Sequence, residues 1–454
     1  MRLGHPAVVQ PSGFDHDVVV LGAGAAGLLA AARAADCGAR VLLLEKNRRA
    51  GVKILMSGGT RCNITNARGL RRLEVVTGPI DPAYDPAQSR GHRAIQQAFG
   101  SAGVFLGPAL RRLDVDATIR LFEEAGVATK IEGNGKVFPV SDRAVDVLDA
   151  LLARLEHSGA VLRCLSPVLA IERIEDPDSR QPGFAVRLPD ATVTARRVIV
   201  AVGGCSYPGC GTTGDGHAIA RELGHTIVEP RPALVPLRVA AGWVAGLKGV
   251  SLPDAVAAVH SADGTLLQQR REAILFTHFG LSGPAILDVS RAAARSGETD
   301  RLVLRLDLLP AIPRDQLDRT LQASCRRGRR PVNALLPEVV PRRLAERLAE
   351  VAAIPPDRMG PDLARDERQR LVAVLKGLSL PIRGTLGFEK AEVTSGGVAL
   401  DEVDPQTLES RRVPGLHFAG EVLDLDGLIG GYNFQAAWST GWLAGETVAT
   451  RLRG

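Results

Sequence analysis

The sequence predicts an α/β protein whose main domain is a parallel sheet assembled from both ends of the chain, with β-rich and helical segments inserted between them. Three observations support this architecture. Near the N-terminus, two short apolar runs flank an Ala/Leu-rich stretch, as in a βαβ unit. Close to the C-terminus, a glycine-rich segment precedes a last apolar helix. Between these regions the hydrophobic pattern first alternates and then takes helical periodicity.

The first part of the chain carries the parallel-sheet signals. Residues 17–21 (DVVVL) are a short apolar run followed by glycine, which is typical of a buried parallel strand. Residues 27–35 suit a helix, and residues 40–45 are a second apolar run with an acid at its end, so that a βαβ unit is expected. Further elements of this half are predicted as a helix over 141–155 and strand-like stretches within 161–174 and 184–200.

The middle of the chain first shows the pattern of antiparallel strands. Residues 255–260 and 264–269 flank an Ala-Asp-Gly turn, which predicts a hairpin. Residues 301–308 alternate between apolar and polar side chains, as a half-buried strand does. The stretch 310–377 has helical periodicity with proline-rich joints, and a last helix is expected over 434–452.

A chain of 454 residues exceeds the ~250–300 that one hydrophobic core usually supports, so that several domains are expected. The changes of pattern predict the boundaries. They are 1–230 for the first part of the main domain, 231–309 for an inserted antiparallel β-barrel-like domain, 310–378 for a small helical domain, 379–395 for a return to the β-rich domain, and 396–454 for the second part of the main domain.

Charge, cysteine and histidine content argue against several classes of protein. The net charge of +6 is small beside 56 Lys and Arg and 50 Asp and Glu. One basic cluster comprises Arg326, Arg327, Arg329 and Arg330; with no nucleic-acid motif beside it, we expect a solvated turn and no nucleic-acid partner, an RNA-associated protein being the alternative. Six Cys do not make a disulfide framework in a chain of this length, and nine scattered His predict no metal site.

Targeting and membrane signals are not visible in the sequence. The segment MRLGHPAVVQPSGFDH lacks the charged start and apolar stretch of a signal peptide, and no uncharged apolar run reaches the roughly 18 residues of a membrane span. We therefore expect a cytoplasmic protein with reduced thiols and no membrane partner.

A nucleotide fingerprint follows the first strand. The segment Gly22-Ala23-Gly24-Ala25-Ala26-Gly27 has the GxGxxG spacing, ends a strand, opens a helix, and is followed by an acid, Glu45, after the next strand. In this context Gly22 permits a tight turn, Gly24 lets a pyrophosphate approach the backbone, and Gly27 lets the helix and strand pack closely. Glu45 would accept hydrogen bonds from a ribose and repel a 2′-phosphate. The pattern predicts a Rossmann-like dinucleotide site.

The C-terminal segment favours FAD over NAD in this site. Residues 413–421 (VPGLHFAGE) form a predicted strand that ends in Gly420-Glu421, and Gly430-Gly431 open the last helix. In two-part FAD sites such a segment returns to cover the flavin, and N–H dipoles at the helix start can face the flavin pyrimidine oxygen. We predict FAD, held non-covalently in a domain built from both chain ends.

A second glycine turn carries polar and thiol side chains. The segment 53–63 (KILMSGGTRCN) could lie along the diphosphate and flavin. Cys62 invites a thiol mechanism, but the position expected for a partner in a C-x4-C pair is Ala67, so we expect Cys62 to pack against the flavin. A pair with that spacing does occur at Cys205 and Cys210, where we expect two free thiols rather than a redox disulfide.

Several stretches together make the chain similar to a known family. ILMSGGTRCNITN, LFTHFGLSGPAILDVSR and LIGGYNFQAAWSTG, with the fingerprint and the segment VGGCSYPGCGTTGDGHAIARELGHTI, span nearly the whole chain. They resemble the bacterial NAD(P)/FAD-dependent oxidoreductases that include aminoacetone oxidase and the dehydro-bile-acid reductase. The resemblance implies an FAD domain from both chain ends, an inserted β-barrel-like domain and a small helical domain. One departure is Thr60, where many members have glycine.

The resemblance also implies site residues. It places diphosphate contact at Gly22, Gly24, Ala25 and Gly27, ribose contact at Glu45, flavin-side contact at Arg61, Cys62 and Asn63, adenine contact at the backbone of Val168, and return-segment contact at Gly420, Glu421, Asp424, Gly431, Asn433 and Phe434. The predicted cofactor site further includes Ala26, Lys46, Ser57, Gly58, Gly59, Gly203, Gly430 and Tyr432.

Hydride transfer between the flavin and a small organic substrate is the predicted activity. An NAD(P)H-linked reductase and an amine or alcohol oxidase both stay open. No second fingerprint is visible, so any NAD(P)H would enter the flavin cleft transiently. The alternative is a flavin-containing redox-sensing or binding protein without turnover. No catalytic residue is assigned, with Tyr432 and His278 as candidates only, and the substrate and oligomeric state are left open.

Overall fold

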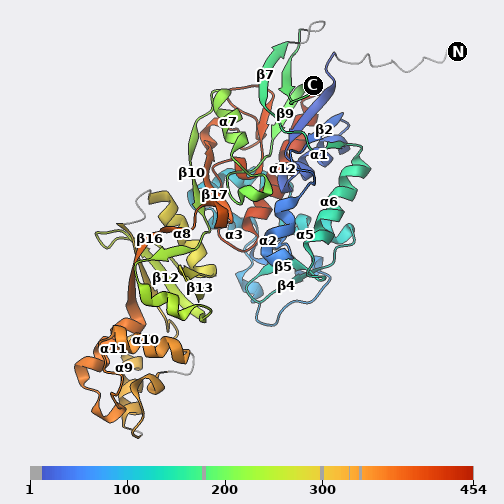
Figure 1. Cartoon of the computed structure of the whole chain (residues 1–454). Coiled ribbons are helices and arrows are strands. Elements are labelled where there is room, and N and C mark those ends of the chain that lie inside the picture. Colours follow the sequence, from blue (N-terminus) through green and yellow to red (C-terminus); the bar gives the residue numbers. More distant parts are fainter. Residues whose placement is uncertain (1–12, 176–179, 297–300, 327, 337–339, 453–454) are drawn as a thin grey trace, which may run out of the picture. The chain divides into compact units, whose positions relative to one another are not determined.

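The computed structural model describes residues 13–175, 180–296, 301–326, 328–336 and 340–452 (Figure 1). It contains two compact units. The first joins Met1–Pro230 to Gly396–Gly454, and the second is Arg231–Ser395. The first unit is therefore built from both ends of the chain. The chain passes between the units within two strands that pair with each other, β10 (Ile227–Ala233) and β17 (Val393–Val398).

A seven-stranded sheet forms the centre of the first unit. Its order is β6-β2-β1-β9-β8-β7, and β18 pairs with the C-terminal half of β9. The strands are β1 (His16–Leu21), β2 (Val41–Leu44), β6 (Val161–Arg163), β7 (Ala170–Glu175), β8 (Pro182–Arg187), β9 (Thr192–Val200) and β18 (Leu416–Phe418). The pairs of β6, β2, β1, β9 and β18 are parallel, whereas β8 and β7 are antiparallel. The predicted α/β class is confirmed.

Apolar cores cover both faces of this sheet. Val18 and Val20 of β1 belong to one cluster of buried side chains, while Val19 and Leu21 belong to another. Because successive side chains of a strand point to opposite faces, the continuous apolar run of β1 is explained by two covered faces.

The helices of the first unit are α1 (Ala25–Asp36), α2 (Val52–Thr60), α3 (His92–Ala98), α4 (Gly107–Arg112), α5 (Val115–Glu124), α6 (Ala144–Ser158), α7 (Asp215–Glu222) and α12 (Tyr432–Thr450). A small sheet adds β3 (Thr65–Asn66), β5 (Lys136–Pro139) and β4 (Thr129–Ile131). Two predicted boundaries were wrong by a few residues. The helix expected from residue 141 begins at Ala144, because the Ser141 hydroxyl accepts the Arg143 N–H before the helix starts. The last helix begins at Tyr432, after the left-handed Gly431.

The second unit contains a closed antiparallel barrel, in the order β11-β14-β13-β12-β15-β16, which confirms the predicted β-barrel insertion. Its strands are β11 (Leu237–Val239), β12 (Ser251–His260), β13 (Leu266–Phe276), β14 (Gly280–Ser282), β15 (Val303–Asp307) and β16 (Leu378–Thr385), with α8 (Pro284–Ser296) between β14 and β15. Between β15 and β16, the described residues include three α-helices, namely α9 (Arg314–Cys325), α10 (Arg342–Val351) and α11 (Arg365–Gly377). Barrel and helical side chains share one apolar core, which holds Leu306 beside Leu317, Leu344 and Leu371.

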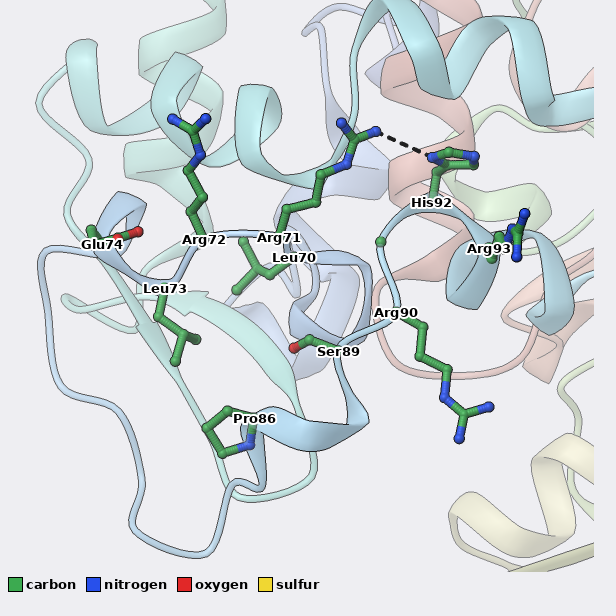
Figure 2. Close-up of a pocket in the computed structure, with 11 residues that line it drawn as sticks. Leu70, Arg71, Arg72, Leu73, Glu74, Pro86, Ser89, Arg90, His92 and Arg93 are labelled. Atoms are coloured by element: carbon green, nitrogen blue, oxygen red, sulfur yellow. Dashed lines mark hydrogen bonds between the residues drawn. The ribbon is translucent and has the colours of Figure 1, made fainter.

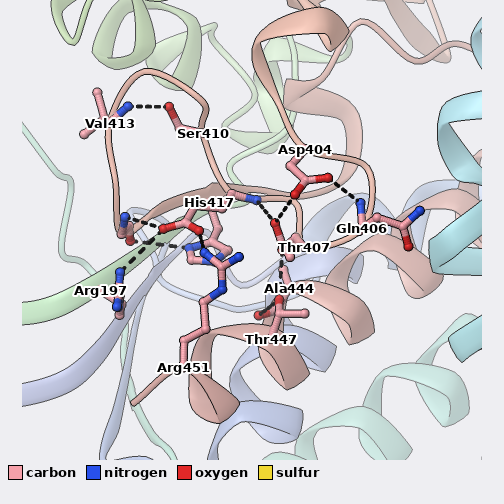
Figure 3. A network of polar contacts seen from close by, with 12 residues as sticks. Arg197, Asp404, Gln406, Thr407, Ser410, Val413, His417, Ala444, Thr447 and Arg451 are labelled. Carbon is pink, nitrogen blue, oxygen red and sulfur yellow. Dashed lines mark hydrogen bonds and ion pairs between the residues drawn. The ribbon is translucent and has the colours of Figure 1, made fainter. Parts of the chain in front are cut away.

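A polar network fixes the beginning of β18 in the first unit (Figure 3). The Glu409 carboxylate accepts the Gly415 N–H at 2.7 Å and forms ion pairs with Arg197 of β9 and Arg451 at the end of α12. Burial and the Arg197 charge lower the pKa of the enclosed His417 to about 3, so that the ring is neutral. The network holds the start of β18 in place, and the end of β18 leads into Gly420-Glu421.

Candidate cofactor site

The glycine fingerprint forms an open cradle at the start of α1. A Cβ built on Gly27 would lie 1.8 Å from the Gly22 carbonyl oxygen, so the strand and helix touch there. A Cβ on Gly24 would meet nothing within 4 Å, and no side chain caps this helix. The first turn, with Ala25 and Ala26, therefore faces open space with its N–H groups and its positive dipole end, which is the arrangement that binds a diphosphate.

Glu45 lies directly beside this cradle. Its buried carboxylate accepts the Ala23 N–H at 2.8 Å with one oxygen and the Asn47 N–H at 2.8 Å with the other. The Glu45 carbonyl accepts the Ser166 N–H at 2.9 Å, and the half-buried Val168 follows two residues later. The structure thus brings together the residues predicted for diphosphate, ribose and adenine. Each carboxylate oxygen keeps lone-pair capacity for a ribose hydroxyl.

Lys46 and Gly203 both contact the glycine-rich loop 211–216. The Lys46 ammonium lies 2.6 Å from the Thr213 hydroxyl and 2.5 Å from the Asp215 carboxylate. A Cβ on Gly203 would lie 3.0 Å from the Thr212 side chain. In this structure, therefore, the Lys46 side chain braces the loop.

The second glycine turn is held in left-handed backbone conformations. Ser57 leaves helical geometry, and Gly58 and Gly59 follow at φ +56° and +68°. Thr60 at +70° and Cys62 at +58° extend the run. Thr60 thus occupies a left-handed position, which costs a β-branched residue roughly 1–2 kcal/mol.

Arg61 points away from this turn to acidic partners. One guanidinium nitrogen lies 2.6 Å from Glu132 and 3.2 Å from Asp142, and the guanidinium carbon lies 3.9 Å from the centre of the Phe138 ring. These contacts raise the Arg61 pKa, chiefly through the Glu132 hydrogen bond. The side chain anchors the turn to the small sheet.

Asn63 and Asn66 join the N-terminal segment to the C-terminal glycine turn. With its amide oriented to match its neighbours, Asn63 donates to the Thr65 carbonyl at 2.9 Å and accepts the Gly431 N–H at 2.9 Å. Asn66 donates to the Gly430 carbonyl at 2.8 Å. A Cβ on Gly431 would lie 2.4 Å from the Thr65 oxygen, so the two segments are in direct backbone contact.

The return segment reaches the start of α1. The Gly420 N–H donates to the Thr440 hydroxyl at 3.0 Å, and a Cβ on Gly420 would lie 2.9 Å from the Ala26 Cβ. The adjacent Glu421 carboxylate contacts the Lys53 ammonium and the Ser206 hydroxyl, each at 2.7 Å. This triad connects three distant segments. Lys53 and Ser206 were not among the predicted site residues, although the segment 53–63 was predicted to lie along the cofactor.

The remaining predicted residues shape the loop before α12. Asp424 accepts the Gly396 N–H at 3.0 Å, and the Asn433 amide oxygen accepts the Gly427 N–H at 2.7 Å. Phe434 stacks on Trp438 with ring centres 5.2 Å apart. The side chains of Asn433 and Phe434 therefore fix the helix start that presents the Gly430-Gly431 turn.

The chain is similar to known proteins over almost its whole length. A family model described as "HI0933-like protein Rossmann domain" matches residues 16–76 and 87–447. The chain belongs to the HI0933-like family. It is 34% identical over 95% of its length to a ribosomal RNA dihydrouridine synthase of Escherichia coli, covering 97% of that protein. It is 32% identical over 95% of its length to a 3-dehydro-bile acid delta(4,6)-reductase of Clostridium scindens, covering 98% of that protein.

Among solved structures, the fold is similar to a 3-ketosteroid-delta4-(5alpha)-dehydrogenase of Rhodococcus jostii, with a TM-score of 0.52, 15% identity, and 97% of this chain and 98% of that chain covered. The HI0933-like family is a family of FAD-dependent oxidoreductases, which confirms the predicted cofactor. The open Gly24 cradle and the Glu45 carboxylate fit the diphosphate and ribose of FAD. The individual contacts stay predictions.

Thiol chemistry has no support in this HI0933-like protein. Cys62 is fully buried, and burial raises its pKa to about 12, so that the thiolate needed for reaction is scarce. Cys205 lies 3.8 Å from a His217 nitrogen, whereas Cys210 contacts the sulfur of Met56 at 3.0 Å. Burial raises the pKa of both thiols as well.

The two candidate catalytic residues lie in different units. Tyr432 is buried in the first unit, while His278 is exposed in the turn between β13 and β14 of the second. Within the described residues, no cluster of His, Cys, Asp and Glu could hold a metal ion. No helix in the described part of the chain is long and apolar enough to cross a bilayer.

Proposed function

We propose that this protein is an FAD-dependent reductase that saturates a carbon–carbon double bond conjugated to a carbonyl group, with uridine of ribosomal RNA as the substrate. The observation that carries the proposal is the 34% identity, over 95% of the chain, to the E. coli ribosomal RNA dihydrouridine synthase. In uridine the C5=C6 bond is conjugated to the C4 carbonyl. Reduction adds a hydride to C6 and a proton to C5.

Features of the cofactor site support a reduction by hydride. FAD supplies two-electron chemistry at its N5 atom when it is bound. The cysteine beside the predicted flavin contacts, Cys62, is buried and protonated, so a dithiol relay is disfavoured. The chain has one dinucleotide fingerprint, at Gly22 to Gly27, and the same cleft would therefore receive NAD(P)H and the substrate in turn. This proposal departs from the expectation that no nucleic acid binds.

A second candidate is the same reaction on a small enone, because the chain is 32% identical to the bile-acid reductase. Its name describes a substrate in which double bonds at positions 4 and 6 are conjugated to an oxo group at position 3. The two candidates share the flavin and differ in the acceptor, so one experiment separates them.

The experiment reduces the purified flavoprotein anaerobically with NADH or NADPH and then adds one acceptor at a time. We expect unmodified ribosomal RNA to restore the oxidised flavin spectrum and to yield a nucleoside two hydrogens heavier than uridine in mass spectrometry. Reoxidation by a conjugated steroid ketone alone would move the assignment to the second candidate. A flavin that neither nicotinamide reduces, but that an amine or alcohol reduces, would point to an oxidase and refute both.

A further inference from the structure

A basic hollow lies on the surface of the first unit (Figure 2). Its volume is about 780 Å³, and two short segments form its walls, 70–74 and 86–93. Four arginines line it, Arg71, Arg72, Arg90 and Arg93, together with His92 and one acid, Glu74. All four arginine residues are exposed.

The arginines of the hollow differ in whether they have an acidic partner. Arg71 lies 3.6 Å from Asp114 and 3.2 Å from the His92 Nδ1 atom. Within the described part of the chain, no carboxylate lies within ion-pair distance of Arg72, Arg90 or Arg93. Three guanidinium groups are therefore available to an anion from outside the chain.

The charge of the hollow acts on His92. Burial lowers the His92 pKa, and the nearby guanidinium groups of Arg71, Arg111 and Arg93 lower it further, while Asp114 opposes them. The arginines that lower the His92 pKa create a positive potential in the hollow, and a positive potential attracts phosphate. Arginine also presents the planar fork that matches phosphate oxygens.

The segments next to the two walls are hydrogen-bonded to the loop 427–431. The first wall begins four residues after Asn66, whose amide donates to the Gly430 carbonyl. The second wall runs into α3, where the Ala98 carbonyl accepts the Leu428 N–H at 3.2 Å. Both walls are thus joined, within a few residues of the chain, to contacts with the segment 427–431, which is the turn predicted to face the flavin.

We propose that this hollow binds the phosphate backbone of the RNA that delivers the uridine to the flavin. The inference rests on the proposed function, because a small enone carries no phosphates to occupy four arginines. The segment between the two walls, 77–86, lies outside the family match. The pyrophosphate of NAD(P)H shares the phosphate chemistry and is separated from RNA by the test.

The test compares two charge-matched triple variants of the full holoprotein. One is Arg72→Gln, Arg90→Gln and Arg93→Gln in the hollow. The other is Arg326→Gln, Arg329→Gln and Arg330→Gln, which removes the same charge from the basic cluster of the second unit. Binding of a labelled single-stranded oligouridylate is measured by fluorescence anisotropy from 50 to 300 mM salt, with flavin content and thermal unfolding as checks of folding.

Three lost phosphate contacts should reduce the slope of log K against log salt by about 2 and weaken binding about 100-fold at 0.1 M salt. The control triple should change little. Equal losses in both variants, or a loss in the control alone, would overturn the proposal. So would an increased KM for NADPH with unchanged RNA affinity, because the hollow would then bind the nicotinamide nucleotide.

Product formation separates this inference from the proposed function. If both variants form dihydrouridine in ribosomal RNA with wild-type kcat/KM, the hollow is not the RNA site, although the function stands. If the hollow variant loses RNA affinity while the wild-type protein forms no dihydrouridine, the binding surface stands and the proposed reaction fails.

Discussion

The two glycines of the fingerprint should respond oppositely to substitution by alanine. A Cβ on Gly24 meets no atom within 4 Å, and its φ of −88° is accessible to alanine. We therefore expect Gly24→Ala to leave the stability of the FAD-free protein within ~0.5 kcal/mol of wild type. The added methyl group nevertheless occupies the space over the start of α1 that a diphosphate needs.

The loss of FAD affinity can be worked from the hydrogen bonds at stake. A hydrogen bond to a charged group contributes ~1.5–3 kcal/mol, so displacing a phosphate from one or two backbone N–H groups costs about 3 kcal/mol. This corresponds to a roughly 100-fold higher Kd for FAD. Gly27→Ala should instead destabilise the protein both with and without FAD, because its Cβ would lie 1.8 Å from the Gly22 oxygen. Such overpacking costs ~1–3 kcal/mol or more.

The assay combines thermal unfolding of FAD-free protein with FAD titration followed by flavin fluorescence. The two variants serve as controls for each other, since each adds one methyl group to the same turn. Wild-type FAD affinity in Gly24→Ala would refute the assignment of this turn to the diphosphate. An equally destabilised FAD-free protein would refute the claim that the space above Gly24 is open.

Three further outcomes are expected. Thr60→Gly should raise the free energy of unfolding by about 0.5–1 kcal/mol in urea titrations, because it relieves a left-handed threonine at φ +70°; unchanged or lower stability would contradict the strain. Cys62 should resist iodoacetamide at pH 8 in the folded protein, since its pKa is about 12, and labelling found by mass spectrometry before unfolding would contradict this. Although burial opposes ionisation of Glu402, hydrogen bonds from Arg412 and Thr226 lower its pKa to about 2. The contribution of the Glu402 carboxylate to the free energy of unfolding is therefore complete above the unfolded pKa near 4.5 and is lost as the pH falls towards 2. Glu402→Gln should flatten the decline of the urea unfolding midpoint in acid.

The cofactor fingerprint could be predicted because all its signals are local. A buried strand, a glycine turn and an acid after the next strand lie within about thirty residues, and each has a direct physical reason. The barrel insertion could be predicted from alternation and turn residues. Helix ends were less accurate, since the start of α12 depends on the left-handed Gly431 in contact with Thr65, which is far away in sequence.

The partners of charged side chains could not be predicted in the same way. The family resemblance implies a flavin-side role for Arg61, and the sequence did not predict that its guanidinium also binds Glu132 and Asp142, which are 71 and 81 residues away. Glu421 and Lys53 are 368 residues apart and meet only in the folded unit. Ion pairs between residues far apart in the chain produce no periodic pattern in the sequence, so they could not be predicted from it.

The basic hollow shows the same limit for a surface. The sequence draws attention to the contiguous cluster near Arg326, whereas the hollow combines two arginines before residue 74 with two after residue 89. Neither half stands out alone. Their convergence depends on the path of the chain between η1 (Ala67–Gly69) and α3, and only the fold reveals it.

The strained turn at the C-terminal end of α2 links these observations. Gly58, Gly59, Thr60 and Cys62 all have left-handed backbone conformations, and such strain persists only where the surroundings over-determine it. Here the surroundings are Arg61 on its acidic partners, the buried Cys62, and Asn63 on the Gly431 N–H. Two of these anchors lie in the N-terminal part of the chain and one in the C-terminal part. Contacts from both ends of the chain therefore stabilise the conformation of this turn, and we expect FAD binding, if the turn contacts the cofactor as predicted, to depend on the same contacts as the folding of the first unit.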